Sequence, residues 1–155
     1  MDQKLAITGI ILLVVATIVL AAPKPRPPEG KSFYLTTTQH DGLNAPFACA
    51  AGYHMANIYE ILDPTGLRYD MSFGATADDS GSGPPGSDDF SGWVRGGRNV
   101  TANPSPHQFE HSCQAYQSSD SELLGSQVFL SSVVAPWGYR ERQCNLTFPV
   151  WCVSD

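Results

Sequence analysis

The segment HQFEH, residues 107–111, holds the residue types of a hydrolytic metal site. On a helix, His107 and His111 would share one face and could bind one Zn²⁺, with Glu110 as general base toward a metal-bound water. Prolines crowd the start of the segment and Cys113 follows it, which leaves room for about two helical turns. We therefore expect a polar loop with two surface histidines. A small metal-dependent hydrolase stays open as an alternative, which a zinc measurement on the purified protein would test.

Hard oxygen ligands gather in the longest loop, residues 74–92. Its four aspartates, Asp78, Asp79, Asp88 and Asp89, could bind Ca²⁺. Their spacing is not that of an EF-hand, because the alternating aspartates and the closing glutamate are missing. We expect a solvated flexible loop, with Ca²⁺ as the one cofactor that remains possible.

An aromatic and charged stretch, PWGYRERQ at residues 136–143, precedes Cys144. Trp137, Tyr139, Arg140 and Arg142 could form an exposed binding loop, since loops on a rigid scaffold carry most recognition surfaces. The other two tryptophans are expected in the core. The chain contains no nucleophile-elbow, phosphate-loop or dinucleotide fingerprint, so we predict no catalytic residues and no enzyme.

The charges exclude one class of partner. From residue 32 onward the chain has five Arg against thirteen Asp or Glu, a net charge of −8. An acidic domain repels phosphate backbones, so nucleic acid is not an expected partner.

The N-terminal region indicates export. Residues 5–22 are eighteen residues without a charge, and at 1.5 Å per residue they would span roughly 27 Å. Residues 1–22 are therefore either a secretory signal peptide or a single transmembrane anchor, and the sequence favours neither. Residues 23–31 form a Pro-rich spacer. We expect the domain to lie outside the cytosol, secreted or membrane-anchored.

The four cysteines of an exported chain indicate disulfides. Four cysteines allow three pairings. A bond between Cys144 and Cys152 is unfavourable, because the extended segment between them spans roughly 20 Å, against about 6 Å between the Cα atoms of a disulfide. We therefore favour a nested pairing, with Cys49–Cys152 outside and Cys113–Cys144 inside. Zinc binding by the thiols is a weaker alternative, since no C-x-x-C pair is present.

Strands and one helix are expected around the cysteines. Residues 31–38 alternate like a strand, and further strands are predicted at 93–97, 128–134 and 146–153. The last of these contains Pro149, which indicates either an edge position or a bulge. Residues 47–64 are predicted to contain a helix with an apolar stripe of Ala51, Met55, Ile58 and Leu62, and with His54 and Glu60 on its polar flank.

This arrangement resembles the C-type lectin-like fold superfamily. The features that carry the resemblance are a first Cys beside an amphipathic helix, a Trp-containing central strand, and a last pair of cysteines eight positions apart; the closing VWCV is most similar to the endostatin branch. The resemblance implies an α+β domain over residues 32–155, with a small antiparallel sheet, one or two helices, long loops and two nested disulfides. It also implies a possible Ca²⁺ in the long loop.

Two properties of that superfamily are not expected here. The Glu-Pro-Asn or Gln-Pro-Asp triplet and the Trp-Asn-Asp triplet of Ca²⁺-dependent sugar binding are absent, and the scattered arginines do not form a heparin-binding face. Asn99 and Asn145 each begin an N-glycosylation acceptor pattern.

The sequence thus predicts a non-enzymatic, extracytoplasmic binding or adhesion module. Its partner would be an extracellular protein or a glycan, and the membrane would be a further partner if the N-terminal segment is retained. A structural envelope component is a third possibility beside the hydrolase.

Overall fold

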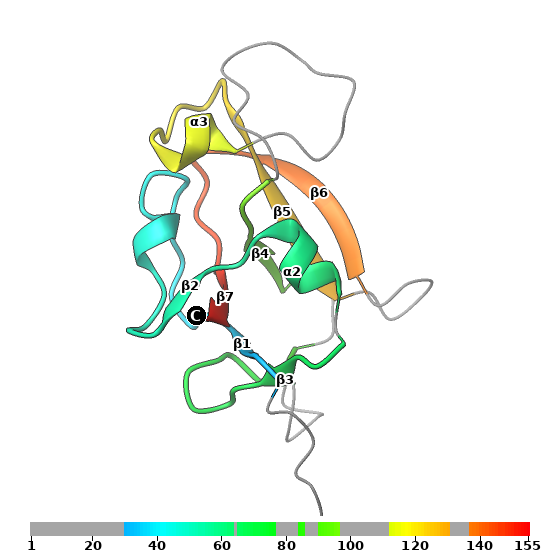
Figure 1. The fold of residues 1–155 in the computed structure, drawn as a ribbon. Coiled ribbons are helices and arrows are strands. Elements are labelled where there is room, and N and C mark those ends of the chain that lie inside the picture. The colour runs from blue at the N-terminus through cyan, green and yellow to red at the C-terminus, as the bar shows by residue number, and fades with distance from the viewer. Residues whose placement is uncertain (1–29, 64, 77–83, 86–89, 97–111, 131–136) are drawn as a thin grey trace, which may run out of the picture.

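The computed structural model describes residues 30–63, 65–76, 84–85, 90–96, 112–130 and 137–155. These residues form a mostly β domain with two sheets, short helical segments and two disulfides (Figure 1). The expected one or two helices are present as the short α2 (Ile58–Leu62) and α3 (Cys113–Tyr116). The domain is nevertheless mostly β, with two sheets instead of one small antiparallel sheet, so the α+β expectation is confirmed only in part.

The first sheet has four strands in the order β2-β7-β1-β3. They are β1 (Ser32–Leu35), β2 (Tyr53–Met55), β3 (Arg68–Tyr69) and β7 (Trp151–Ser154). β7 pairs antiparallel with both β1 and β2, whereas β1 pairs parallel with β3, so the sheet is mixed. β7 thus lies inside the sheet.

The edge position predicted from Pro149 is wrong. Pro149 precedes β7, so its missing N–H removes no bond of the strand itself. Its carbonyl instead accepts a hydrogen bond from the backbone N–H of Trp93 at 2.9 Å. The proline therefore lies where the chain passes from one sheet to the other.

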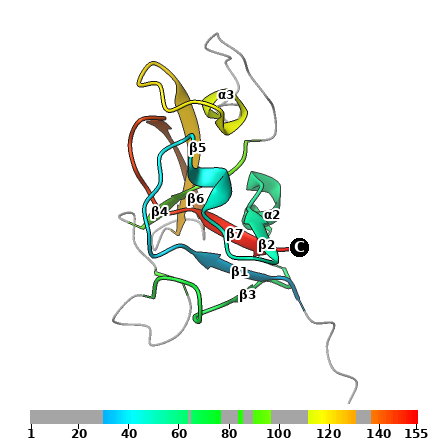
Figure 2. The same ribbon diagram turned by 90° about the vertical axis from the view of Figure 1, so that its left-hand side faces the viewer.

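The second sheet is antiparallel, in the order β4-β5-β6. Its strands are β4 (Ser91–Trp93), β5 (Leu124–Leu130) and β6 (Trp137–Gln143). Its strands cross those of the first sheet steeply, as the two views in Figures 1 and 2 show. The strands predicted at 93–97 and 128–134 are shifted toward the N-terminus in the described residues, and residues 131–136 lie outside them.

The helix predicted within residues 47–64 is mostly wrong. The chain there forms a 3₁₀ turn, η1 (Ala45–Phe47), then β2, and only then the short helix α2 (Ile58–Leu62). Gly52 has φ +82°, a left-handed conformation that interrupts a right-handed helix. As a consequence Ala51 is exposed and the expected apolar stripe does not exist as one face.

The two disulfides are nested as predicted. Cys49 and Cys152 are joined with Cα atoms 5.8 Å apart, and Cys113 and Cys144 with Cα atoms 5.6 Å apart. Cys113, one end of the second bond, is the first residue of α3 (Cys113–Tyr116), a four-residue turn. Two such bonds indicate an oxidising, extracytoplasmic environment.

Both faces of the first sheet are buried. Phe33 and Trp151 pack with Val128 of the second sheet in one cluster, while Tyr34 and Cys152 pack on the opposite face in another. This follows from the two-residue period of a strand, because successive side chains point to opposite faces. The indole N–H of Trp151 donates to the carbonyl of Val128 at 3.0 Å and so joins the two sheets.

No helix among the residues that the structure describes is long and apolar enough to cross a membrane. The apolar segment of residues 5–22 lies outside that part of the chain.

Candidate functional site

An open cleft of about 400 Å³ lies where β1 begins, next to α2 and the turn that leads to β3. We call it the α2 cleft. Its functional side chains are four polar groups and two apolar ones, Lys31, Glu60, Asp63, Thr65, Tyr59 and Leu67. The cleft therefore combines charge with an apolar wall, as ligand sites usually do.

A capping box fixes the start of α2 and with it the side chain of Glu60. The Asn57 side chain accepts from the backbone N–H of Tyr59 at 2.9 Å, and Glu60 Oε2 accepts from the backbone N–H of Asn57 at 3.0 Å. These bonds satisfy two N–H groups that a helix start otherwise leaves unpaired. Glu60 is thereby held at the cleft in one orientation.

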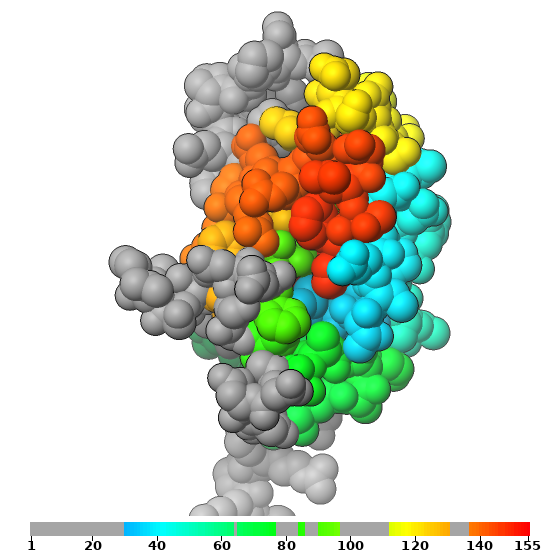
Figure 3. All heavy atoms as spheres, turned by 180° about the vertical axis from the view of Figure 1, so that it is seen from behind, coloured from blue at the N-terminus to red at the C-terminus, as the bar shows by residue number. Residues whose placement is uncertain are grey.

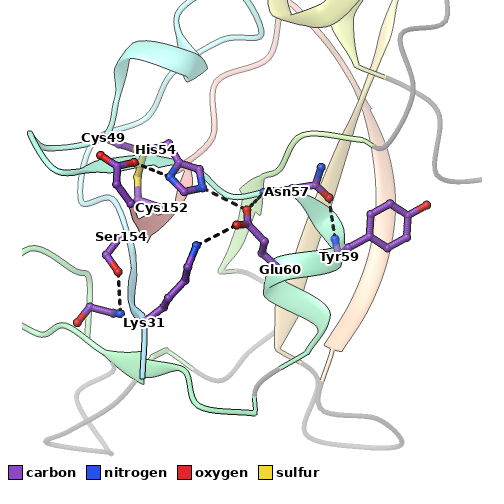
Figure 4. A network of polar contacts seen from close by, with 10 residues as sticks. Lys31, Cys49, His54, Asn57, Tyr59, Glu60, Cys152 and Ser154 are labelled. Carbon is purple, nitrogen blue, oxygen red and sulfur yellow. Dashed lines mark hydrogen bonds and ion pairs between the residues drawn. A yellow bond between two sulfur atoms is a disulfide. The ribbon is translucent and has the colours of Figure 1, made fainter. Parts of the chain in front are cut away.

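Glu60 also belongs to a network of charged side chains (Figure 4). Its Oε1 lies 3.4 Å from Lys31 Nζ, and its Oε2 lies 3.2 Å from His54 Nε2. The other ring nitrogen of His54, Nδ1, lies 2.8 Å from Asp155 Oδ1. The imidazole therefore joins two carboxylates, one on α2 and one just after β7.

The network is not arranged as a metal site. The two nitrogens of His54 lie on opposite sides of its ring, so Glu60 and Asp155 cannot bind one ion together with either nitrogen. Among the described residues, no group of three or more His, Cys, Asp or Glu is placed to hold a metal ion.

Two carboxylates of the cleft are held in the charged form. Partial burial opposes ionisation of Glu60, but the Asn57 backbone N–H, His54 and Lys31 together lower the pKa of the carboxyl below its ordinary value. The hydroxyl and backbone N–H of Thr65 likewise lower the pKa of Asp63. At neutral pH the α2 cleft thus carries two negative charges and one positive charge, that of Lys31.

The apolar wall of the cleft comes from Tyr59 and Leu67. The Tyr59 side chain is 70% exposed, and in Figure 4 its ring points away from the network. Leu67 is partly buried and packs against the core. An exposed aromatic ring beside two carboxylates suits a ligand with a cationic or donor group next to an apolar one.

The predicted binding loop at Trp137, Tyr139, Arg140 and Arg142 is a strand, β6, and this part of the prediction is corrected. Trp137 packs edge-on against Trp151, with ring centroids 5.2 Å apart. Arg140 lies over the Phe129 ring at 5.1 Å and donates to the hydroxyl of Ser91. The sequence WGYRERQ is compatible with a half-buried strand. Gly138 is a residue typical of loops, so the strand pattern was not recognised in the sequence.

The remaining predicted sites fall largely outside the described residues. They are the metal candidates His107, Glu110 and His111, the loop aspartates Asp78, Asp79, Asp88 and Asp89, and the acceptor Asn99. Asn145 is described and lies exposed in the turn after β6, where the backbone N–H of Leu146 donates to the carbonyl of Gln143 at 3.1 Å.

The α2 cleft was missed in the sequence, although one signal was available. Asn57 followed three residues later by Glu60 is the pattern of a helix start, and it would have placed both residues correctly. Lys31 and Asp155 had no comparable signal in the sequence. Pairing between strands that are far apart along the chain brings Lys31 to Glu60 and Asp155 to His54.

Comparison of the chain with protein-family models, with curated proteins and with solved structures finds no match.

Proposed function

We propose that this chain is a non-enzymatic, exported binding module with a C-type lectin-like architecture, and that it binds its ligand in the α2 cleft. The nested disulfides and the early strand paired with a late one support the architecture. The observation that carries the binding role is the pair of charged carboxylates, Glu60 and Asp63, beside the exposed ring of Tyr59.

The charge of the cleft defines the ligand class. Lys31 is already paired with Glu60 at 3.4 Å, so among the described residues that line the cleft no second cation is present to pair with Asp63. The domain as a whole is also acidic, so it attracts positive ligands over a distance. We infer an extracellular protein segment that presents Lys or Arg next to an apolar side chain.

The scaffold suits such a role. Glu60 is fixed by the capping box. The strand before α2, β2, pairs with β7, and Cys152 of β7 is bonded to Cys49. A site held in one conformation loses little entropy when the ligand binds. Binding should therefore depend on the disulfide-bonded state of the protein.

A peptide array probed with the purified, non-reduced protein tests this function. We expect enrichment of peptides that carry Lys or Arg beside Leu, Phe or Tyr. Anisotropy titration of an enriched peptide should show that Tyr59→Ala and Asp63→Asn each weaken binding at least about tenfold, which corresponds to about 1.4 kcal/mol.

Asp120→Asn is the matched control. Asp120 Oδ1 accepts the backbone N–H of Glu122 at 2.9 Å, just as Asp63 Oδ1 accepts that of Thr65 at 3.0 Å, but Asp120 does not line the cleft. Equal binding by the Asp63 variant and the wild type, or equal losses in both aspartate variants, would refute the assignment of the cleft.

A further inference from the structure

His54 lies between two carboxylates in the network beside the α2 cleft. Its Nδ1 is 2.8 Å from Asp155 Oδ1, and its Nε2 is 3.2 Å from Glu60 Oε2. Figure 4 shows the imidazole ring between these two contacts. Both ring nitrogens therefore face a group that carries negative charge when it is ionised.

The two contacts need a proton on each ring nitrogen. A neutral imidazole has an N–H on one nitrogen and a lone pair on the other, whereas an imidazolium has an N–H on both. An ionised carboxylate has no hydrogen to donate, so it can only accept. The observed arrangement is therefore that of the imidazolium, and a neutral ring would turn a lone pair toward one of the two carboxylates.

The contact with Glu60 is the one expected to lose its proton. The distance to Asp155 is shorter, so the proton that remains is better placed on Nδ1. Glu60 also keeps two other partners: the backbone N–H of Asn57 donates to it at 3.0 Å, and Lys31 Nζ lies 3.4 Å from its other oxygen. Deprotonation of His54 should therefore leave Glu60 in place and remove one positive charge beside it.

The charged groups around His54 come from three elements. Glu60 belongs to α2, Asp155 follows β7, and Lys31, just before β1, lies on the far side of Glu60. The lowered pKa values of Glu60 and of its neighbour in the cleft, Asp63, keep both carboxylates charged above pH 5. Histidine is the one residue type in this set whose charge ordinarily changes between pH 5 and 8.

We propose that His54 makes ligand binding in the α2 cleft depend on pH. The imidazolium competes with a cationic ligand for the negative charge of Glu60, and loss of its Nε2 proton makes the region around the cleft more negative by one charge. The proton passes to solvent, because 38% of the His54 side chain is exposed. The protein thus holds a Lys- or Arg-containing ligand at neutral pH and releases it in mildly acidic surroundings. This inference rests on the binding role proposed for the cleft.

The binding test is an anisotropy titration of an end-capped peptide that contains Arg next to Leu and no His. The full, non-reduced chain is titrated between about pH 5 and pH 8 at constant ionic strength, a range in which Arg stays charged. We expect the affinity to rise at least about threefold toward pH 8, the size of a partly exposed charge interaction. His54→Gln should bind at every pH about as the wild type does at pH 8.

His40→Gln is the matched control. His40 is also partly exposed, but its Nε2 lies 2.8 Å from the Thr38 hydroxyl and it does not line the α2 cleft. It belongs to the segment before η1, which pairs with Phe148 beyond Cys144; the back view in Figure 3 shows these two segments side by side in cyan and red-orange. This variant should keep the pH dependence of the wild type.

NMR of the histidine ring nitrogens gives a readout that needs no ligand. At the acidic end both nitrogens of His54 should be protonated, and at the alkaline end Nδ1 should keep the proton while Nε2 carries the lone pair. The inference is overturned if Nε2 keeps the proton instead, if the affinity does not rise with pH, if His54→Gln keeps the pH dependence, or if His40→Gln loses it. Failure of the cleft itself has a different signature, because Asp63→Asn would then bind as the wild type does at every pH.

Discussion

Four consecutive residues in the turn α3, Cys113 to Tyr116, have left-handed backbone angles, with φ between 49° and 60°. None of them is glycine, and a left-handed conformation costs about 1–2 kcal/mol per such residue. A disulfide and a hydrogen bond stabilise the two ends of the turn. Cys113 is bonded to Cys144, and the hydroxyl of the buried Tyr116 donates to the carbonyl of Val94. The two middle residues, Gln114 and Ala115, are exposed and make no such contact.

Gln114→Gly should therefore stabilise the protein. Glycine adopts the left-handed conformation without steric cost, and the expected gain in the free energy of unfolding is about 1 kcal/mol. Urea unfolding of the non-reduced protein measures it. Gln117→Gly is the control, because Gln117 has φ −107° and is also exposed, so the same change there should destabilise by about 0.5–1 kcal/mol. Effects of the same sign at both positions would contradict the left-handed turn.

At the scale of elements, α2 depends on its cap more than on its length. A helix of five residues is far too short to be stable alone, so the capping box and the burial of Ile58 and Ile61 must maintain it. The backbone at the start of α2 is tied to the segment after β4, since the N–H of Ile58 donates to the carbonyl of Arg95 at 2.9 Å. The cleft consequently keeps its shape only while the cap is intact.

Asn57→Ala should lower the free energy of unfolding by about 1 kcal/mol, because the cap bond to the Tyr59 backbone is lost. Asn44→Ala is the matched control: Asn44 occupies the N-cap position of η1, but its side chain makes no capping bond. We expect a clearly smaller effect there in the same urea titration. Equal destabilisation would show that the Asn57 side chain does not cap α2.

The sequence allowed prediction of the elements whose pattern is local. The strand at β1 alternates strongly. The extended geometry of the chain before Cys152 excluded one of the three disulfide pairings, and the nested pairing that we favoured among the other two is confirmed. The predicted helix was too long. Met55 and Ile58 are three positions apart, which fits a helix, but Met55 lies on β2 and Ile58 on α2. Helical spacing alone cannot reveal a left-handed Gly52 between two apolar residues.

The candidate site was less predictable than the fold. The charged network beside the α2 cleft joins residues 31, 54, 60 and 155. The pairing of β7 with both β1 and β2 brings them together, and that pairing is decided by packing between distant parts of the chain. Contacts of this kind have no signature in a short stretch of sequence, and the Asn57–Glu60 pair is the exception because it is local.

At the scale of the whole molecule, half-buried tyrosines make the stability of both sheets depend on pH. Burial raises the pKa of Tyr69, on β3, to about 12, although its hydrogen bond with the Leu35 backbone acts in the opposite direction. Burial also raises the pKa of Tyr139, on β6, to about 12, with Glu141 contributing. Both hydroxyls therefore remain protonated in the native protein at pH values where an unfolded chain ionises.

Alkaline titration should expose this linkage. A raised native pKa gives stability that is complete below the unfolded value of 10.0 and is lost as pH rises through about 12. We expect the free energy of unfolding to fall between pH 10 and 12, measured by urea unfolding at each pH. Tyr69→Phe should be less stable at neutral pH, because it loses hydrogen bonds, but its stability should fall less steeply over this interval. A slope identical to that of the wild type would contradict the protonated, buried state of Tyr69.

The central place of β7 in the first sheet constrains how the protein is made. Cys49 is synthesised 103 residues before its partner Cys152, and both neighbours of β7, which are β1 and β2, end by Met55. The sheet cannot close before β7 is synthesised, so Cys49 remains an unpaired thiol until the last strand arrives. Efficient production should therefore require a thiol isomerase or a holding chaperone in the destination compartment, and shortening the chain before residue 151 should leave an aggregation-prone product.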